Sequence, residues 1–141
     1  IARQVGLHYE VILKGKIDDL ERLDDTTKLA AYRIIQESIT NVIRHAHASR
    51  CKVTLSVNQR GSELFLIVGV QDDGVGLNNV PNIERVFTSI RDRALALNGC
   101  LHIRSRSGLR VHALLRQRIA PYVKSVGSTS TDQRALRPDF S

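Results

Sequence analysis

Apolar residues recur along most of the chain with two periods, one typical of strands and one typical of helices. Four apolar residues from Leu7 to Leu13 alternate with more polar ones, so a strand with one apolar face is expected there. After a connector at 15–23, apolar residues recur at steps of three and four, as on the buried side of a helix. The members of that expected buried stripe are Leu29, Tyr32, Ile35, Ile39, Val42 and Ala46.

The second half of the chain shows the same two periods in a regular order. The run Leu64–Val70 is apolar on both faces, which predicts a central strand with helices on one side and a cover on the other. The Asp-rich turn that begins at Asp72 ends this strand. The other expected elements are a strand at 51–58 with a hairpin turn at 60–62, a helix at 83–97 closed by Asn98-Gly99, and strands at 101–103 and 109–115 joined at Ser107–Gly108.

This order of elements predicts an α+β fold. Strand, helix, two strands, helix and two strands fit a two-layer α/β sandwich with a mixed, mostly antiparallel sheet and helices on one face. We expect one domain over 1–119. The segment 120–141 is rich in Ser and Thr and loses periodicity, so a flexible tail or a vector-derived extension is expected there.

Charge and cysteine content narrow the function classes. The net charge is +7, but the basic residues are scattered and no aromatic stacking residues lie among them, so a nucleic-acid partner is not expected. A solvated basic surface, or one that faces acidic partners or phosphates, explains the charge as well. Cys51 and Cys100 lack zinc-type spacing, and both are expected as reduced core residues.

The first helix carries a set of polar residues on one side. Glu37 and Asn41, with either Arg44 or His45, are spaced four and seven or eight positions apart, which places them together. The oxygens of a carboxylate and an amide suit Mg²⁺ and its waters. Glu37 could hold or deprotonate a metal-bound water, or orient the attacking group. An ordinary solvated polar face has the same spacing, so the alternative stays open.

A second candidate follows the central strand, where the sequence reads Asp72-Asp-Gly74-Val-Gly76. Glycines let the backbone turn sharply and approach a flat ligand. A carboxylate fixed at a strand end can accept a hydrogen bond from an exocyclic amine such as that of adenine. Asp-Asp-Gly is also a common turn, so this motif alone does not distinguish the two.

Together the two motifs are more specific. The helix reading from Tyr32 to Ala46, with its QE, TN and HA elements, lies about 30 residues before the Asp-rich turn, with two expected strands in between. This combination resembles the N box and the first glycine box of the GHKL ATPase superfamily, and within it the nitrate- and hexose-phosphate-type sensor histidine kinases. The resemblance covers residues 5–118 and implies a Bergerat-type ATP-binding fold.

The resemblance also implies roles for the individual residues. Glu37 corresponds to the N-box glutamate that assists phosphoryl transfer, and Asn41 to the ligand of Mg²⁺. Arg44 and His45 are expected near the phosphates of ATP. The remaining nucleotide-binding residues that it implies are Asp72 at the adenine amine, Gly74 and Gly76 at the adenine floor, and Arg91 at the charged end of the lid.

A sensor kinase of this kind transfers the ATP γ-phosphoryl to a histidine on a separate helical dimerisation domain. The resemblance therefore implies that domain and a response regulator as partners. It also implies a homodimeric parent protein, free or anchored in an inner membrane, with this part in the cytoplasm.

Two stretches depart from the family pattern. Val86 and Ser89 stand where the family's lid has glycines, and Leu109 replaces a hydroxyl residue near the adenine. Either the lid is unusual and ATP still binds, or the domain is a degenerate pseudo-kinase module that acts through protein–protein contacts. The retained Glu37 and Asp72 favour ATP binding.

Overall fold

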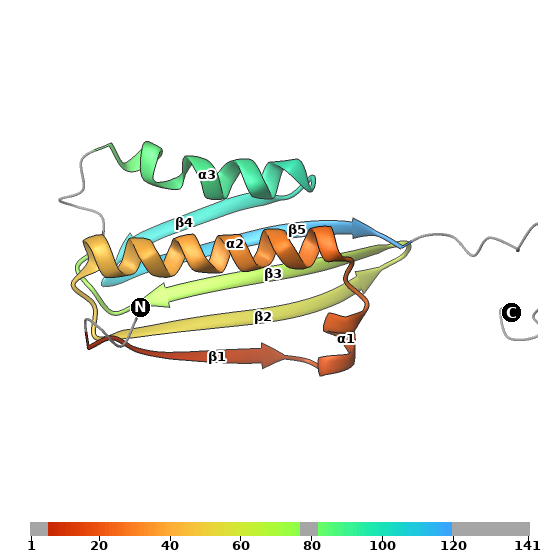
Figure 1. The fold of residues 1–141 in the computed structure, drawn as a ribbon, viewed down its shortest axis with the longest axis horizontal. Helices are drawn as coiled ribbons and strands as arrows, with labels where there is room; N and C mark the ends of the chain where they lie inside the picture. Colours follow the sequence, from red (N-terminus) through yellow and green to blue (C-terminus); the bar gives the residue numbers. More distant parts are fainter. Residues whose placement is uncertain (1–5, 77–81, 120–141) are drawn as a thin grey trace, which may run out of the picture.

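The computed structural model describes residues 6–76 and 82–119, and these form a five-stranded sheet with the long helices on one side (Figure 1). The predicted α+β sandwich is confirmed. The elements are β1 His8–Lys14, α1 Ile17–Glu21, α2 Asp25–Asn41, the π-helical turn η2 Val42–Ala46, β2 Arg50–Arg60, β3 Glu63–Asp72, α3 Ile83–Ala96, β4 Cys100–Arg106 and β5 Gly108–Arg118.

The strand order in the sheet is β1-β2-β3-β5-β4. Strand β1 pairs parallel with β2, and all other neighbours are antiparallel, so the sheet is mixed and mostly antiparallel as expected. The hairpin between β2 and β3 turns at Gly61, and the one between β4 and β5 turns at Ser107. The expectation for 120–141 concerns residues outside the described part.

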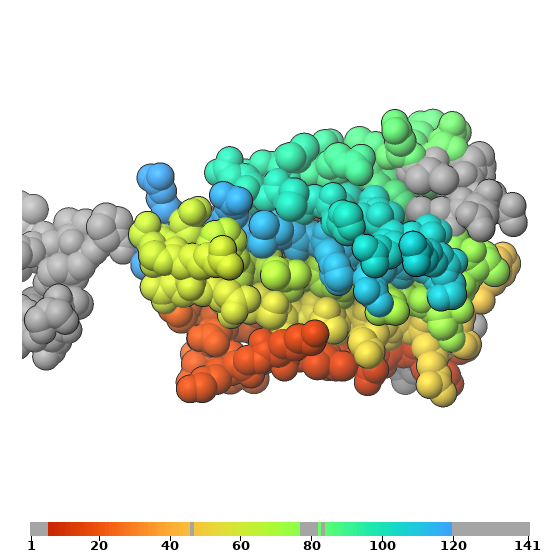
Figure 2. Space-filling model, turned by 180° about the vertical axis from the view of Figure 1, so that it is seen from behind, coloured from red at the N-terminus to blue at the C-terminus, as the bar shows by residue number. Residues whose placement is uncertain are grey.

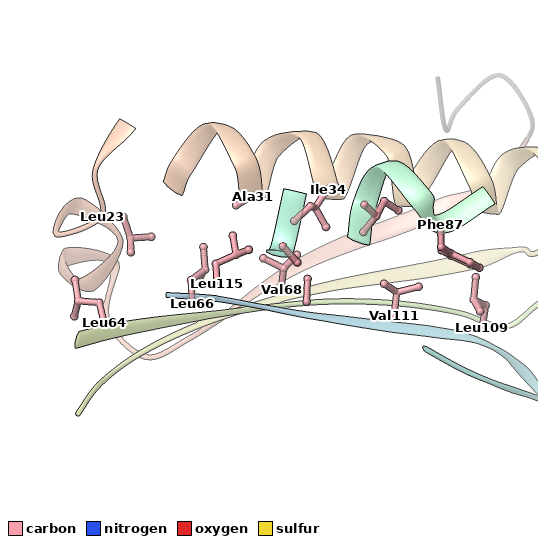
Figure 3. Close-up of a cluster of buried hydrophobic side chains, with 13 residues drawn as sticks. Leu23, Ala31, Ile34, Leu64, Leu66, Val68, Phe87, Leu109, Val111 and Leu115 are labelled. Atoms are coloured by element: carbon pink, nitrogen blue, oxygen red, sulfur yellow. The ribbon is translucent and has the colours of Figure 1, made fainter. Parts of the chain in front are cut away.

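Helices α2 and α3 close the core by packing on one face of the sheet (Figure 3). Ile34 from α2, Phe87 and Ile90 from α3, and Val68 and Leu115 from the strands are all at most 1% exposed. Aliphatic side chains fill most of this core, as the low aromatic content requires. Among the described helices, none combines the length and the apolar character needed to cross a bilayer.

The predicted buried stripe of α2 was partly wrong. Val42 is buried, but Leu29 and Tyr32 are 55% and 60% exposed. The residues that face the sheet are Thr27, Ala31, Ile34 and Ser38. The buried side of the helix therefore differs from the side that hydrophobicity alone predicts. Two of its buried positions are occupied by the polar residues Thr27 and Ser38. The side chain of Ala46 lies outside the described part.

Both ends of the first connector have a local explanation. The Asp24 side chain accepts a hydrogen bond of 2.8 Å from the Thr27 amide and so caps the N-terminus of α2. The preceding segment is not only a connector, because Ile17–Glu21 forms the short helix α1. That turn brings the chain from the edge strand β1 up to the helical layer (Figure 1).

Three other expectations fail at the margins of the sheet. Tyr9 and Val11 are more than half exposed, because β1 is an edge strand that α2 does not cover. Cys51 is buried as expected, but Cys100 is exposed. The face of β3 turned away from the helices is not closed over by any described element, and Ile67 on it is 38% exposed (Figure 2).

The corrected stripe of α2 gives a direct test. Ile34→Ala removes a fully buried side chain and should lower the free energy of unfolding by about 2–5 kcal/mol. Leu29→Ala, on the exposed side of the same helix, should change it by no more than about 0.5 kcal/mol. Urea unfolding of both variants checks this, and equal losses would contradict the observed rotation of α2.

Candidate functional site

The carboxyl ends of α2 and β3 meet at one edge of the molecule (Figure 1). Val42, next to Asn41, packs with Val70, two positions before Asp72, in a small cluster with Cys51. The candidate residues of the helix motif and those of the strand motif therefore lie at the same edge of the molecule. The start of α3 and the β4–β5 turn lie at this edge as well.

Asp72 is the most constrained polar residue of this edge. It is only 4% exposed, and its Oδ1 accepts hydrogen bonds from the Gly74 amide at 2.8 Å and the Leu109 amide at 3.3 Å. Its Oδ2 is buried and has no hydrogen-bond partner. A buried acceptor without a partner is costly, so this oxygen is ready to accept a donor from a ligand.

Two glycines allow the backbone to close tightly around Asp72. A Cβ on Gly108 would overlap the Asp72 carbonyl oxygen, and one on Gly76 would overlap the Ser105 hydroxyl. Both residues have a positive φ, which glycine adopts at no steric cost. The hairpin β4–β5 can therefore approach the Asp72–Gly76 turn closely. Gly74 contributes the amide that binds the carboxylate.

Asp73, the neighbour of Asp72, faces another way. Its carboxylate accepts hydrogen bonds from the amide and hydroxyl of Ser49 at 2.8 and 2.7 Å and from the Arg50 amide at 2.9 Å. These bonds tie the turn to the start of β2. The two adjacent carboxylates thus have different tasks, because one is buried with a vacant acceptor and the other is exposed and saturated.

Glu37 lies between the two long helices. Its Oε1 accepts a hydrogen bond of 3.0 Å from the Ser89 hydroxyl and pairs with Arg93 Nε at 3.3 Å. Both partners come from α3, where a spacing of four places them on one side. These contacts fix the orientation of the carboxylate, and they join α3 to α2 next to Asn41.

Asn41 ends the regular part of α2, and the π-helical turn follows it. Its Nδ2 is buried without a hydrogen-bond partner, and so is the Ser38 hydroxyl one helical turn earlier. π-Helical turns are often found at functional sites. The same turn carries Arg44, which is exposed, and His45, which is partly buried.

Some features of the edge differ from the expected constellation. Arg91 is exposed and lies two helix positions before Arg93, so it is on another side of α3 from Glu37. A hollow of about 600 Å³ beside β1 and β2 is lined by Asp72 and Asp73 but by neither Glu37 nor Asn41. The candidate site is therefore defined by the buried polar atoms and not by this hollow.

The sequence did not indicate the residues that hold the functional groups in place. The sequence predicts Ser89 only as a residue in place of a lid glycine, and it predicts no role for Arg93. Leu109, noted as a missing hydroxyl, supplies its backbone amide to Asp72 and packs in the core. The spacing of Ser89 and Arg93 was visible in the sequence, but nothing in it pointed to Glu37.

These residues fit an adenine nucleotide with a divalent ion. A vacant buried carboxylate oxygen matches an amine donor, and the turn that holds it contains no Cβ at its two closest approaches. A buried amide and a carboxylate from one helix offer oxygens suited to Mg²⁺. The arrangement defines a nucleotide-binding ATPase domain.

The comparisons with known proteins agree. The sequence profile of the histidine kinase-, DNA gyrase B- and HSP90-like ATPases matches residues 26–119. The chain therefore belongs to this family, and it is an ATP-binding domain of the type found in sensor histidine kinases. Members of the family bind ATP, usually with Mg²⁺.

Curated relatives and a solved structure point to the same class. The histidine-protein kinase/phosphatase UhpB of Salmonella typhimurium is 35% identical over 107 residues, which are 75% of this chain and 20% of UhpB. The sensor protein VraS of Staphylococcus saprophyticus is 36% identical over 51% of this chain and 20% of VraS. The chain thus spans about a fifth of these relatives.

The histidine kinase domain of a blue-light activated kinase from Erythrobacter litoralis superposes with a TM-score of 0.59 and 18% identity. The match covers 81% of this chain and 54% of that one. At this identity the likeness concerns the fold.

The two carboxylates should affect stability with opposite signs as the pH changes. Burial, with a smaller contribution from the Asp73 charge, raises the pKa of Asp72 above its ordinary 3.8, although the bonds from Gly74 and Leu109 oppose the rise. The hydrogen bonds from Ser49, followed by that from Arg50, lower the pKa of Asp73 to about 2.

Asp72 therefore costs the folded state stability as the pH rises from 3.8 through its raised pKa, and Asp72→Asn should gain stability relative to the unmodified chain over that rise. Asp73 contributes stability that is present above pH 3.8 and is lost as the pH falls toward 2. Asp73→Asn should thus be less stable at neutral pH, with a difference that shrinks on acidification. Urea unfolding at several pH values measures both, and differences with the same pH dependence would contradict the assignment.

Proposed function

We propose that this chain binds ATP with Mg²⁺ and forms the catalytic part of a sensor histidine kinase. The observation that carries the proposal is the buried, unpartnered Oδ2 of Asp72, which lies at the same edge as Asn41 and Glu37. Membership of the ATPase family and the similarity to UhpB and VraS support it.

In this proposal, Asp72 accepts a hydrogen bond from the exocyclic amine of adenine. The amides of Gly74 and Leu109 hold its Oδ1, so that Oδ2 stays aimed at the donor. Gly76 and Gly108 let the β4–β5 hairpin close against the Asp72 turn, because a Cβ at either position would overlap Ser105 or Asp72. Because the site is buried, an analogue without the amine would leave the carboxylate unpaired and bind much more weakly.

Asn41 holds the metal ion through its amide oxygen, and Arg44 and His45 on the following turn neutralise phosphate charge. Arg91, which is exposed on α3, is a further candidate contact for the phosphates. ATP, when bound, supplies the phosphoryl group for an in-line transfer. The residues of this chain supply position and charge neutralisation for that transfer.

Glu37 would orient the attacking histidine of a phosphoacceptor domain and could take up its proton; with Mg²⁺ bound it could instead hold one of the waters of the ion. The hydrogen bond from Ser89 and the ion pair with Arg93 select one orientation of the carboxylate. A general base contributes only when it is within hydrogen-bond reach of the proton it removes, so this orientation matters for the rate. Arg93 and Ser89 act through Glu37 and are positioning residues.

The altered lid is consistent with this function. Val86 packs against the core and Ser89 binds Glu37, so the two residues that replace glycines have structural tasks. The alternative of a degenerate module without nucleotide binding is not favoured, because the groups that would bind adenine and metal are retained and preorganised.

The wider setting follows from the same proposal. The phosphoryl group passes to a histidine on a helical dimerisation domain, and from there to a response regulator. The parent protein is a homodimer that keeps this part in the cytoplasm, free or attached to a membrane anchor. We propose the boundary of the ATP-binding domain at residue 119.

Nucleotide titration calorimetry tests the binding proposal. ADP or a non-hydrolysable ATP analogue should bind with Mg²⁺ and much more weakly with EDTA. Asp72→Asn should weaken binding about tenfold or more, since a buried acceptor is lost. Asp73→Asn is the matched control, because that carboxylate is bound by Ser49 and Arg50, and its affinity should stay within about twofold. Equal losses, or no binding at millimolar nucleotide, would refute the assignment.

Transfer of phosphate to the helical domain of the same polypeptide, supplied in trans, tests the catalytic role. Glu37→Gln should slow transfer from Mg-ATP by about 10²–10⁴-fold while the nucleotide affinity stays nearly constant. Glu63→Gln, at the far hairpin, serves as control and should transfer normally. An unchanged rate in the Glu37 variant would remove this residue from the reaction.

A further inference from the structure

The sheet face turned away from the helices carries a row of basic side chains. The strand registers place Arg104 opposite Arg110, Arg110 opposite Gln71, and Gln71 opposite Lys52. These four side chains point to the same face, because directly paired residues share a side of the sheet. The row continues to Glu10 on β1, opposite Lys52, so it crosses all five strands with three positive charges and one carboxylate.

The next row has the same character. His102 lies directly opposite His112, which in turn lies opposite Gly69. The side chains of Thr54 and His112 close over Gly69, where a Cβ would overlap both of them. Like charges directly opposite each other destabilise a sheet, so the arginine pair costs stability that nothing else in the fold explains.

Glu10 is the one carboxylate in this row, and none of the arginines of this face forms an ion pair with a described carboxylate. The one ion pair between described residues joins Arg93 to Glu37 on the helical side. Partial burial, followed by the charges of Arg110, His102, Lys14 and Arg104, lowers the pKa of His112 below its ordinary range. This face therefore carries an excess of positive charge.

The arginines also surround a hollow. A depression of about 170 Å³ at the end of this face is lined by Arg104, Arg106 and Arg110, together with Gln71 and Ser107. Asp72 touches its rim as well, but the amides of Gly74 and Leu109 hold the Oδ1 of that carboxylate. The hollow also reaches Gly108 and Leu109, so it lies at the end of the sheet beside the Asp72 turn. Arg110 alternates with the buried Leu109 and Val111, so its side chain is on the rear side of the sheet.

We propose that this hollow is a second anion site that binds a phosphate group. Three guanidinium groups outnumber the one carboxylate at the rim, that of Asp72, and their planar forks match the oxygens of a phosphate dianion. A nucleic-acid strand fits less well, because such proteins stack bases on aromatic rings, and Phe65 on this face is covered by Arg116 at 5.4 Å. The phosphate is that of a small phosphorylated molecule or of a lipid headgroup, which share this chemistry.

Titration of the chain with inorganic phosphate and pyrophosphate, without Mg²⁺ or nucleotide and at constant ionic strength, tests the site. In NMR spectra the arginine side chains and backbone of 104–110 should shift, and the pKa of His112 should rise as the anion offsets the positive field. Arg104→Gln/Arg110→Gln should weaken binding about tenfold or more. Arg33→Gln/Arg60→Gln has the same net charge and should stay within about twofold.

Vesicles distinguish the two sources of phosphate. Retention on vesicles that contain phosphatidic acid, but not on phosphatidylcholine alone, together with its loss in the Arg104/Arg110 variant, would identify a lipid headgroup. Saturable binding of the free anions without retention on vesicles would identify a small molecule. Equal losses in the two double variants, shifts confined to α2 and α3, or no binding of either probe would overturn the proposal, whatever the nucleotide titration shows.

Discussion

The seat of α2 on β3 is the contact on which the rest of the molecule depends. Ile34 and Val68 share the main core, and eight positions along the helix Val42 packs with Val70 in the second cluster. Two fixed points determine both the rotation and the position of the helix. Since one residue corresponds to about 100° of rotation, a helix seated one position away would turn Glu37 out of the site. The same contact buries polar groups of the helix at a cost in folding free energy, and the candidate site is built from these buried groups.

The third element of the site, α3, is fixed by polar contacts as well as by its apolar side. Phe87 and Ile90 place the helix on the sheet, while Ser89 and Arg93 reach across to Glu37. A lid rich in glycine would wrap phosphates with its backbone, whereas here a serine in the same place restrains a carboxylate of the neighbouring helix. The departure from the family pattern therefore exchanges backbone freedom for a defined carboxylate orientation. The sheet separates the helical side, where buried polar atoms have no hydrogen-bond partner, from a rear face that carries several basic side chains.

Much of the fold could be predicted from the sequence, because strand alternation and turn residues are local properties. The orientation of α2 could not, since Thr27 and Ser38 are buried although polar, and periodicity selects apolar residues such as Tyr32. Burial of β1 was overestimated because the sequence does not reveal which strand lies at an edge. Asp72 was indicated by its motif, and its buried state agrees with the expected use. The partners of Glu37 were missed because they are 52 and 56 positions away on a separate helix.

The central claim is that the amide of α2 and the carboxylate of β3 serve one ligand. Backbone NMR shifts on addition of ADP, first without and then with Mg²⁺, test it most directly. The account predicts that the nucleotide shifts the amides of Asp72, Gly74 and Leu109, and that the metal adds shifts at Asn41 within the same saturable event. Shifts at only one of these two elements, or at both with different affinities, would contradict it.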